Sequence, residues 1–489
     1  MPRWIKTNQL DNRVQDSTMP APYFEKRTKA YLGWLLVVWL FSSICFGRDE
    51  TSWPASQNLQ EAWASLPVAD TGMSTPLPTW ARTLARTLPH TTAALLELET
   101  LYRTEPLTLP VNLDSTDPSK TSGPQLAGVA RFSVAAYHKS AYGMAVAIAD
   151  LKRANSQPII DAMEKDPKDL PPLEYEVFVF ARQMAELGQS LTDEQYNSLQ
   201  RKLGDEAMVG LVLRIAHGCF QDRLLWAIGI ANVADGNSEP INIHFVDSMP
   251  NGANTPSAVR EDGGELLASI ARDKQIDAPK RVSNEDEKVL KNLGFTTIQQ
   301  MLENQRERNP RIAVPDWDSI SPKLSPGLYR RPLQIRWSRV VVGYQPKLGP
   351  AWIKCLRVFE QEAHQDRVFE ESVFWVVTRG LKCYYCMGHC EMLMEVGGLK
   401  QPGIADRTSR LSSGDWSTFS KGEQAAFQFA KKLTEAPTTV GQGDVHRLRE
   451  TLGNTRAIDV IWWSSRCQFM TKVSDAFQLR LERENVFAD

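Results

Sequence analysis

The sequence has few cysteines, no long basic run and few strand-and-turn patterns, and each absence excludes a class of protein. Seven cysteines among 489 residues are too few for a disulfide scaffold. No run of Lys and Arg exceeds two residues and the formal net charge is −2, so no nucleic-acid partner is expected. Alternating strand patterns joined by Asn-Gly or Asp-Gly turns are scarce. The 42% of apolar and 23% of charged residues are typical of a globular protein, and the length allows two domains or more.

One uncharged segment of 17 residues, 30–46, stands near the beginning of the chain. Basic residues precede it and acidic residues follow it, and about 17 apolar residues is the shortest stretch that spans a bilayer. Small residues at Cys45 and Gly47 also fit a signal-peptide cut before Arg48. We therefore predict a cytoplasmic or leader segment over 1–29, a signal peptide or transmembrane helix over 30–47, and a spacer over 48–80. The rest of the chain is expected to be exported, either membrane-anchored or free in a periplasmic or other extracytoplasmic space.

The remaining sequence shows helical periodicity. In 174–187 and 423–433, apolar residues recur at intervals of three and four. Asp193 and Ser420 are placed as N-caps, and Glu423 completes a capping box with Ser420. We predict an all-α fold.

A weak internal repeat divides the chain. An offset of 249 aligns Phe178, Leu199 and Gly204 with Phe427, Leu448 and Gly453, where each glycine is expected to end a short helix. An offset of 248 aligns Val129, Arg131 and Tyr137 with Val377, Arg379 and Tyr385. The repeat predicts two tandem helical halves, 81–233 and 346–489, joined by a connector over 234–345 that carries exposed helix near 283–307.

Three of the seven cysteines fall within eight residues, as Cys383, Cys386 and Cys390. The helical pattern pauses at Gly380 and resumes at Glu391, which predicts Cys383 at the start of a helix and Cys386 in its first turn. Residues three apart share a helical face, so the two sulfurs can form a disulfide. The positive end of the helix dipole is expected to lower the cysteine pKa.

Two further residues complete the predicted site. His389 follows Cys386 by three residues on the same face and can act as its base or proton relay. Glu371 precedes Cys383 by twelve residues, and a return of the following helix would bring its carboxylate near the thiols. The catalytic set predicted from the sequence is Cys386, Cys383, His389 and Glu371.

This spacing of a glutamate, a CxxC pair and a histidine one turn later resembles the AhpD-like alkylhydroperoxidases of the carboxymuconolactone decarboxylase superfamily. The resemblance covers about 350–482 and extends to 85–232 through the repeat. It implies an all-helical oligomer that reduces peroxides or disulfides, with Cys386 oxidised to sulfenic acid and Cys383 closing the disulfide. It also implies that the first half replaces the neighbouring subunit of a homo-oligomer.

The sequence departs from the family pattern in two places. The family histidine commonly lies four residues after the second cysteine, where this chain has Cys390 as a third thiol. The first half lacks the site. The offset of 248 places Ala135, His138, Ala141, Tyr142 and Gly123 opposite Cys383, Cys386, His389, Cys390 and Glu371. His138 is then expected to be a polar helix residue near a subunit-like interface.

Two other interpretations of the cysteine cluster stay open at this stage. Cys383, Cys386, His389 and Cys390 are potential zinc ligands, although four ligands within two helical turns do not readily surround one tetrahedral ion. The CxxC pair could instead be a structural disulfide in a non-enzymatic interaction module. The redox reading predicts no cofactor, a hydroperoxide or disulfide as substrate and a thiol reductant as electron donor. Arg466 and Lys472 are interpreted as surface charges.

Overall fold

The computed structural model describes residues 66–71, 76–110, 121–231, 239–241, 243–245, 294–329 and 331–488. Within these ranges the chain is mostly helical and has almost no strand, which confirms the predicted all-α class. The hydrophobic segment 30–47 and most of the predicted spacer lie outside the described residues. None of the helices in the described part of the chain has the length and apolar character that crossing a bilayer requires.

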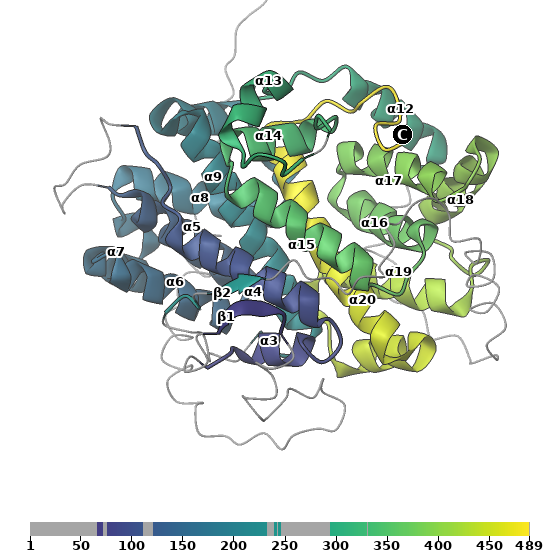
Figure 1. Ribbon diagram of the computed structural model, residues 1–489, viewed down its shortest axis with the longest axis horizontal. Coiled ribbons are helices and arrows are strands. Elements are labelled where there is room, and N and C mark those ends of the chain that lie inside the picture. Colours follow the sequence, from purple (N-terminus) through teal and green to yellow (C-terminus); the bar gives the residue numbers. More distant parts are fainter. Residues whose placement is uncertain are drawn as a thin grey trace, which may run out of the picture.

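A first helical set, α5–α9, forms the blue and teal side of the molecule (Figure 1). Its elements are α5 (Gly123–His138), α6 (Ala141–Arg153), α7 (Gln157–Lys165), η1 (Pro167–Asp169), α8 (Pro172–Glu186), η2 (Gly188–Ser190) and α9 (Asp193–Ala227). The cap of α9 is Thr192 rather than the predicted Asp193. The Thr192 hydroxyl accepts from the Gln195 backbone N–H, and the Gln195 side chain accepts in return from the Thr192 N–H. Asp193 instead accepts a hydrogen bond from Arg311.

A second helical set, α16–α20, forms the green and yellow side (Figure 1). It consists of α16 (Arg367–Leu381), α17 (Tyr384–Val396), α18 (Gln401–Ser413), α19 (Lys421–Glu435), η4 (Pro437–Thr439) and α20 (Gln442–Phe477). The predicted capping box of Ser420 and Glu423 is present at the start of α19.

The two longest helices share an unusual kink. Gly204 in α9 has φ 75° and ψ 168°, and Gly453 in α20 has φ 77° and ψ 166°. This backbone region is essentially restricted to glycine. Each glycine therefore separates a short helix from a long one, as predicted for both positions.

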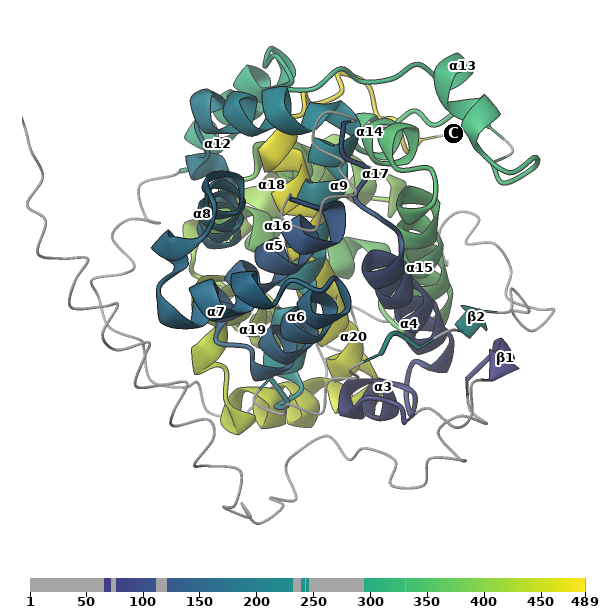
Figure 2. The same cartoon turned by 90° about the vertical axis from the view of Figure 1, so that its left-hand side faces the viewer.

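Between and beside the two sets lie the remaining elements: β1 (Val68–Thr71), α3 (Thr79–Leu84), α4 (Pro89–Thr104), β2 (Ile243–Phe245), α12 (Phe295–Arg306), α13 (Trp317–Ile320), η3 (Ser321–Lys323), α14 (Arg336–Tyr344) and α15 (Leu348–Glu362). β1 and β2 pair antiparallel, and Figure 2 shows them beside α4. The helix expected to be exposed near 283–307 buries one face, because Ile298 and Leu302 of α12 are inaccessible to solvent.

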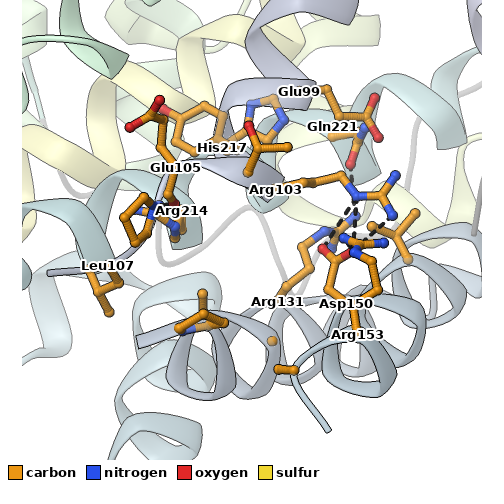
Figure 3. Close-up of a pocket in the computed structure, with 18 residues that line it drawn as sticks. Glu99, Arg103, Glu105, Leu107, Arg131, Asp150, Arg153, Arg214, His217 and Gln221 are labelled. Carbon is orange, nitrogen blue, oxygen red and sulfur yellow. Dashed lines mark hydrogen bonds and ion pairs between the residues drawn. The ribbon is translucent and has the colours of Figure 1, made fainter. Parts of the chain in front are cut away.

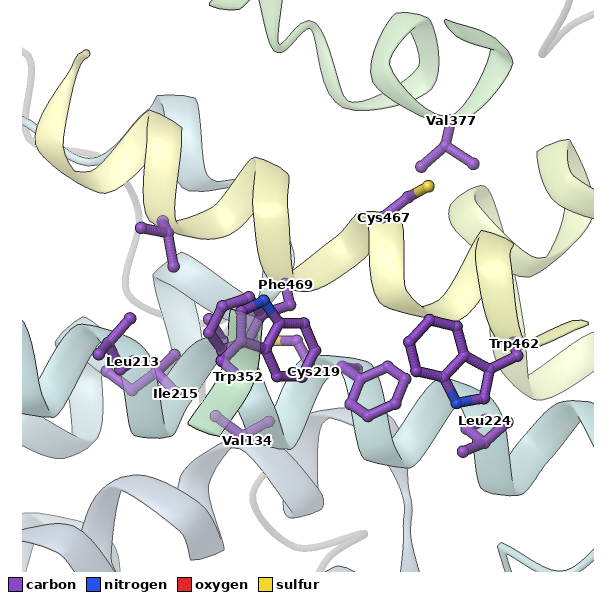
Figure 4. Packing of buried hydrophobic residues seen from close by; sticks show 14 of the residues in the cluster. Val134, Leu213, Ile215, Cys219, Leu224, Trp352, Val377, Trp462, Cys467 and Phe469 are labelled. Atoms are coloured by element: carbon purple, nitrogen blue, oxygen red, sulfur yellow. The ribbon is translucent and has the colours of Figure 1, made fainter. Parts of the chain in front are cut away.

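The core is shared by both sets, because α9 and α20 pack against each other through the middle of the molecule (Figure 4). Phe220 of α9 meets Trp462 of α20 edge to face at 5.7 Å between ring centroids. Trp352 of α15 stacks on Phe469 of α20 at 3.8 Å. Cys219, Cys355 and Cys467 are buried in this core, as expected for small apolar side chains.

Candidate functional site

The turn between α16 and α17 positions the CxxC pair. Lys382 adopts a left-handed conformation (φ 57°, ψ 31°) and ends α16, so the break in the helix falls two residues after the predicted Gly380. Gly380 remains helical and packs against Thr434. Cys383 is the N-cap of α17, its N–H donating to the Thr378 carbonyl at 3.0 Å, and Cys386 is the third residue of the helix. This confirms the predicted placement of both cysteines.

Both sulfurs are free thiols in the interior. Cys383 is 0% and Cys386 3% exposed. The face of α20 opposite the start of α17 provides their surroundings. The Cys383 Sγ lies 4.0 Å from the Thr471 carbonyl oxygen, and the Cys386 Sγ lies 3.3 Å from the Ser474 Oγ.

The pKa of the Cys383 thiol contradicts the sequence-based expectation. Burial raises this pKa well above its usual value, and contact with Cys386 and the charge of Asp475 add to the effect. The backbone N–H of Cys386, at the positive end of α17, acts in the predicted direction and lowers it. Desolvation outweighs the helix terminus because the sulfur is completely enclosed.

Two charged residues of α20 lie next to Cys383: Asp475, which was missed from the sequence, and Lys472, which was placed on the surface. Asp475 interacts with the Cys383 thiol, and burial raises the pKa of its carboxyl group to about 7. Lys472 is only 1% exposed, and burial lowers its pKa to about 8. Its ammonium group donates to the carbonyls of Ala185 and Glu186 at the end of α8, at 3.1 and 3.4 Å.

The interpretation of Lys472 and Arg466 as surface charges is therefore wrong. Arg466 is also buried, with its guanidinium 3.8 Å from the centroid of the Trp463 ring. A usable signal existed in the sequence. Lys472 and Asp475 stand three residues apart in the long apolar segment 455–481, where charged side chains on an otherwise apolar face require a buried partner.

His389 is held by a carboxylate. Its Nε2 lies 2.7 Å from the Glu482 Oε2, and its ring lies against Tyr385 and Phe487. Glu482 also accepts from the Tyr385 hydroxyl at 3.2 Å and from the Arg336 backbone N–H at 2.8 Å. Burial alone would raise the pKa of Glu482, but hydrogen bonding to His389 and the charge of that ring lower it. The structure thus places His389 one turn after Cys386, with Glu482 rather than the thiol as its hydrogen-bond partner.

Glu371 lies beside the third thiol. Its Oε1 is 3.4 Å from an Arg367 Nη, whereas its buried Oε2 has no hydrogen-bond partner among the described residues. Burial raises the pKa of Glu371, against the opposing charges of Arg367 and Arg466. Burial raises the pKa of Cys390, and the charge of Glu371 adds to this effect. Burial also raises the pKa of Cys467, against the opposing charge of Arg466, and Glu371 again adds to the increase. This carboxyl group is therefore close to Cys390, whereas Asp475 is the carboxyl group that contacts Cys383.

The alternative metal site has no support in the geometry. In the described parts of the chain, no three His, Cys, Asp or Glu side chains gather in an arrangement that could hold a metal ion. The four potential ligands face different partners. Cys383 faces Thr471, Cys386 faces Ser474 and His389 faces Glu482. Cys390 lies in the interior near Glu371 and Cys467.

The first helical set contains a turn that resembles the CxxC turn, at a different offset from the one predicted. Lys139 ends α5 with φ 55° and ψ 38°, and Ser140 caps α6, exactly 243 residues before Lys382 and Cys383. In this turn Ser140 and Gly143 stand where Cys383 and Cys386 stand in the other, whereas the predicted offset of 248 places Ala135 and His138 opposite the two cysteines. The offset grows to 249 further on because α18 has 13 residues where α7 has nine, and the connections before and after α18 are each one residue longer.

His138 is buried in a polar cluster that gives both of its ring nitrogens a partner. Its Nδ1 lies 3.1 Å from the Asp222 Oδ2 and its Nε2 lies 2.9 Å from an Arg223 Nη. Burial, with the charge of Arg223, lowers the pKa of His138 to about 4. Arg131 also binds Asp222, at 2.7 Å. The cluster ties α5 to α9.

No protein-family model matches this chain, and no curated protein matches it significantly.

Proposed function

We propose that this chain is a thiol-dependent oxidoreductase, a peroxidase or disulfide reductase, whose working group is the Cys383–Cys386 dithiol. The observation that carries the proposal is the contact between two free thiols at the start of α17, with an acid of pKa about 7 beside one of them. A dithiol supplies two electrons without a cofactor, and an acid that titrates near neutrality can move the protons that accompany them.

The peroxidase reaction would proceed in two balanced steps. The Cys386 thiolate attacks the O–O bond of a hydroperoxide, forming a sulfenic acid and releasing the alcohol after the alkoxide takes a proton. The Cys383 thiolate then attacks the Cys386 sulfur, forming the disulfide and releasing water. A dithiol partner, or two thiols, returns two electrons and two protons and is itself oxidised to a disulfide.

The contacts favour this division of roles. Cys386 is the slightly more exposed residue of the two and is the one to meet the oxidant. Asp475 contacts Cys383 and takes the proton from the attacking thiol. His389, oriented by Glu482, lies one turn beyond Cys386 and serves as the proton relay for the departing oxygen. Glu371, beside Cys390, is the candidate relay to the third thiol.

We also propose that the chain consists of two tandem AhpD-like repeats, of which only the second keeps the dithiol. Support comes from the matched turns at Lys139 and Lys382 and from the matched kinks at Gly204 and Gly453. The first set would then take the place of a neighbouring subunit. The carbonyls of Ala185 and Glu186 beside Lys472 are consistent with that role.

A structural cysteine pair is the second candidate, favoured by the near-complete burial of both sulfurs. Such a pair would exchange no electrons with small molecules while the protein is folded. Accessibility to oxidant in the native state therefore separates the two candidates.

The test is a thiol count and peptide mass spectrometry on the reduced full chain, before and after one equivalent of tert-butyl hydroperoxide. The wild type is expected to lose two thiols and gain a Cys383–Cys386 crosslink. Cys383→Ser should stop at a sulfenic acid on Cys386, trapped by dimedone, and Cys386→Ser should lose the fast reaction altogether.

Cys355→Ala is the matched control, because Cys355 is a buried cysteine of the core outside the cluster. It should react as the wild type does. If the thiols of the native wild type react only after denaturation, the pair is structural and the enzymatic proposal fails.

A further inference from the structure

A cavity of about 250 Å³ lies between α4 and the first helical set (Figure 3). Residues of α4, α5, α6 and α9 line it. Figure 3 shows Arg214 and His217 toward one side of the space and Gln221, Arg103 and Asp150 toward the other. Its volume is below the roughly 300–1,000 Å³ of sites for drug-sized ligands, so it suits a smaller molecule.

Several buried polar groups on the cavity wall lack partners. Neither ring nitrogen of His217, nor the hydroxyl of Tyr102, nor the Nε of Arg214 has a hydrogen-bond partner among the described residues. The side chains are all more than nine-tenths buried, His217 being 4% exposed. Buried polar atoms in folded proteins are nearly always hydrogen-bonded. Three such side chains around one cavity indicate a polar occupant.

The charges around the cavity favour an anion. Arg131 is neutralised by Asp222, and Arg103 by Asp150 at 2.8 Å. Arg214 differs, because its hydrogen bonds go to the backbone carbonyls of Gly210 and Glu105.

The remaining ionisable groups leave that positive charge in place. The Glu105 carboxylate, which lies near Arg214, is paired with Lys347 at 2.9 Å. Burial lowers the pKa of His217 to about 3, so the ring is neutral, and burial raises the pKa of Glu99. Burial lowers the pKa of Arg214 to about 10, so its guanidinium stays charged at neutral pH. Arg153 also pairs with Asp150, so among the described residues Arg214 is the arginine of the cavity wall that no carboxylate pairs with.

The rest of the wall is apolar. Leu107, Ala127 and Val146 line the cavity with the polar groups. We propose that this cavity binds a small organic acid with a single carboxylate. The carboxylate pairs with Arg214. An oxygen of this carboxylate, or another oxygen of the acid, accepts a hydrogen bond from Tyr102 or His217. The hydrocarbon part packs on the apolar wall. A dianion such as phosphate would leave one buried negative charge uncompensated.

The test uses calorimetric titration and thermal unfolding of the full chain with acetate, lactate and benzoate, and with inorganic phosphate and benzamide for comparison. At least one carboxylate is expected to bind and to raise the unfolding midpoint. Benzamide and phosphate should bind at least tenfold more weakly than that carboxylate. Equal binding of phosphate, or no binding of any of the three carboxylates, would overturn the proposal.

Two variants locate the site. Arg214→Gln should weaken carboxylate binding at least tenfold, whereas Arg447→Gln, on an exposed part of α20, should leave it unchanged. His217→Phe retains the stacking on Tyr102 but removes both unpartnered nitrogens. It should weaken binding while raising the midpoint of the ligand-free protein. Unchanged binding in His217→Phe and Arg214→Gln would show that the carboxylate sits elsewhere, and a lowered ligand-free midpoint in His217→Phe would contradict the unpartnered nitrogens.

Discussion

The turns before α6 and α17 have nearly the same backbone conformation, but the first carries a serine and a glycine where the second carries two cysteines. Ser140 has φ −89° and ψ 104°, and Cys383 has φ −87° and ψ 91°. The Ser140 hydroxyl accepts from the Gly143 N–H at 3.1 Å and serves the helix end. Three residues after Cys383, a second thiol occupies the position of Gly143. A Cβ on Gly143 would overlap the Arg131 guanidinium, so in the first set the ion pair of Arg131 and Asp222 fills that space.

The comparison extends to the buried carboxyl groups. Asp222 in the first set binds Arg131 and His138 with both oxygens, and these partners hold its pKa well below the usual range even though burial acts to raise it. In the second set Glu371 and Asp475 have raised pKa values. A satisfied cluster stabilises a fold, whereas an incompletely satisfied acid near thiols can exchange protons.

The largest expected effect on the free energy of unfolding comes from removing the Asp222 carboxylate. Asp222→Asn leaves Arg131 without its carboxylate and should cost about 3–5 kcal/mol in the free energy of unfolding. Because the folded pKa of Asp222 is depressed, its contribution is present above the unfolded pKa and declines as the pH falls below it. Urea unfolding at pH 7 and at pH 3 measures both points. Glu371→Gln is the comparison in the second set and should change stability by less than about 1 kcal/mol, because one carboxyl oxygen has no partner to lose.

An intermediate effect tests whether the two sets share their backbone requirements. Gly204→Ala and Gly453→Ala each place a Cβ at positive φ, and each should cost about 1–3 kcal/mol. The Cβ would meet only Pro110 at 3.8 Å in the first case and nothing within 4 Å in the second, so backbone strain is the common cause. Denaturant midpoints of the two variants should agree closely. A harmless alanine at one position and a costly one at the other would contradict the likeness of the kinks.

The smallest effect on stability concerns Asp475. Its folded pKa of about 7 exceeds the unfolded value, so this group destabilises the fold increasingly as the pH rises from about 4 to 7. Asp475→Asn should therefore raise stability at pH 8, although the loss of the charge beside Lys472 offsets part of the gain, and leave it nearly unchanged at pH 3. In the same variant the rate of disulfide closure should lose its increase between pH 6 and 8. Stopped-flow thiol loss after peroxide measures that rate, and an unaltered pH profile would remove Asp475 from the proposed mechanism.

Local rules made part of this structure predictable. The capping box at Ser420, the glycine kinks and the position of Cys383 at a helix start all follow from residues within one or two turns of each other. The boundary errors are local too, since Thr192 rather than Asp193 caps α9 and the break falls at Lys382 rather than Gly380.

The surroundings of the thiols were not predictable in the same way. Thr471 and Ser474 meet Cys383 and Cys386 from 88 residues further along the chain, and only the packing of α17 on α20 brings them together. The expected lowering of the cysteine pKa also failed for this reason, because a helix terminus can be read from sequence but the depth of burial cannot. The offset of 248 could not show the likeness of the turns at Ser140 and Cys383, which are 243 residues apart, because the greater length of α18 than α7 is not evident from the sequence.

The packing of α9 against α20 has a consequence for how the protein unfolds. Phe220 of one helix rests on Trp462 of the other, and the Lys472 ammonium holds the last carbonyls of α8. Neither set could melt without exposing the aromatic surface of its neighbour to water. Heating should therefore give a single calorimetric transition, and separately expressed fragments should regain order only when mixed.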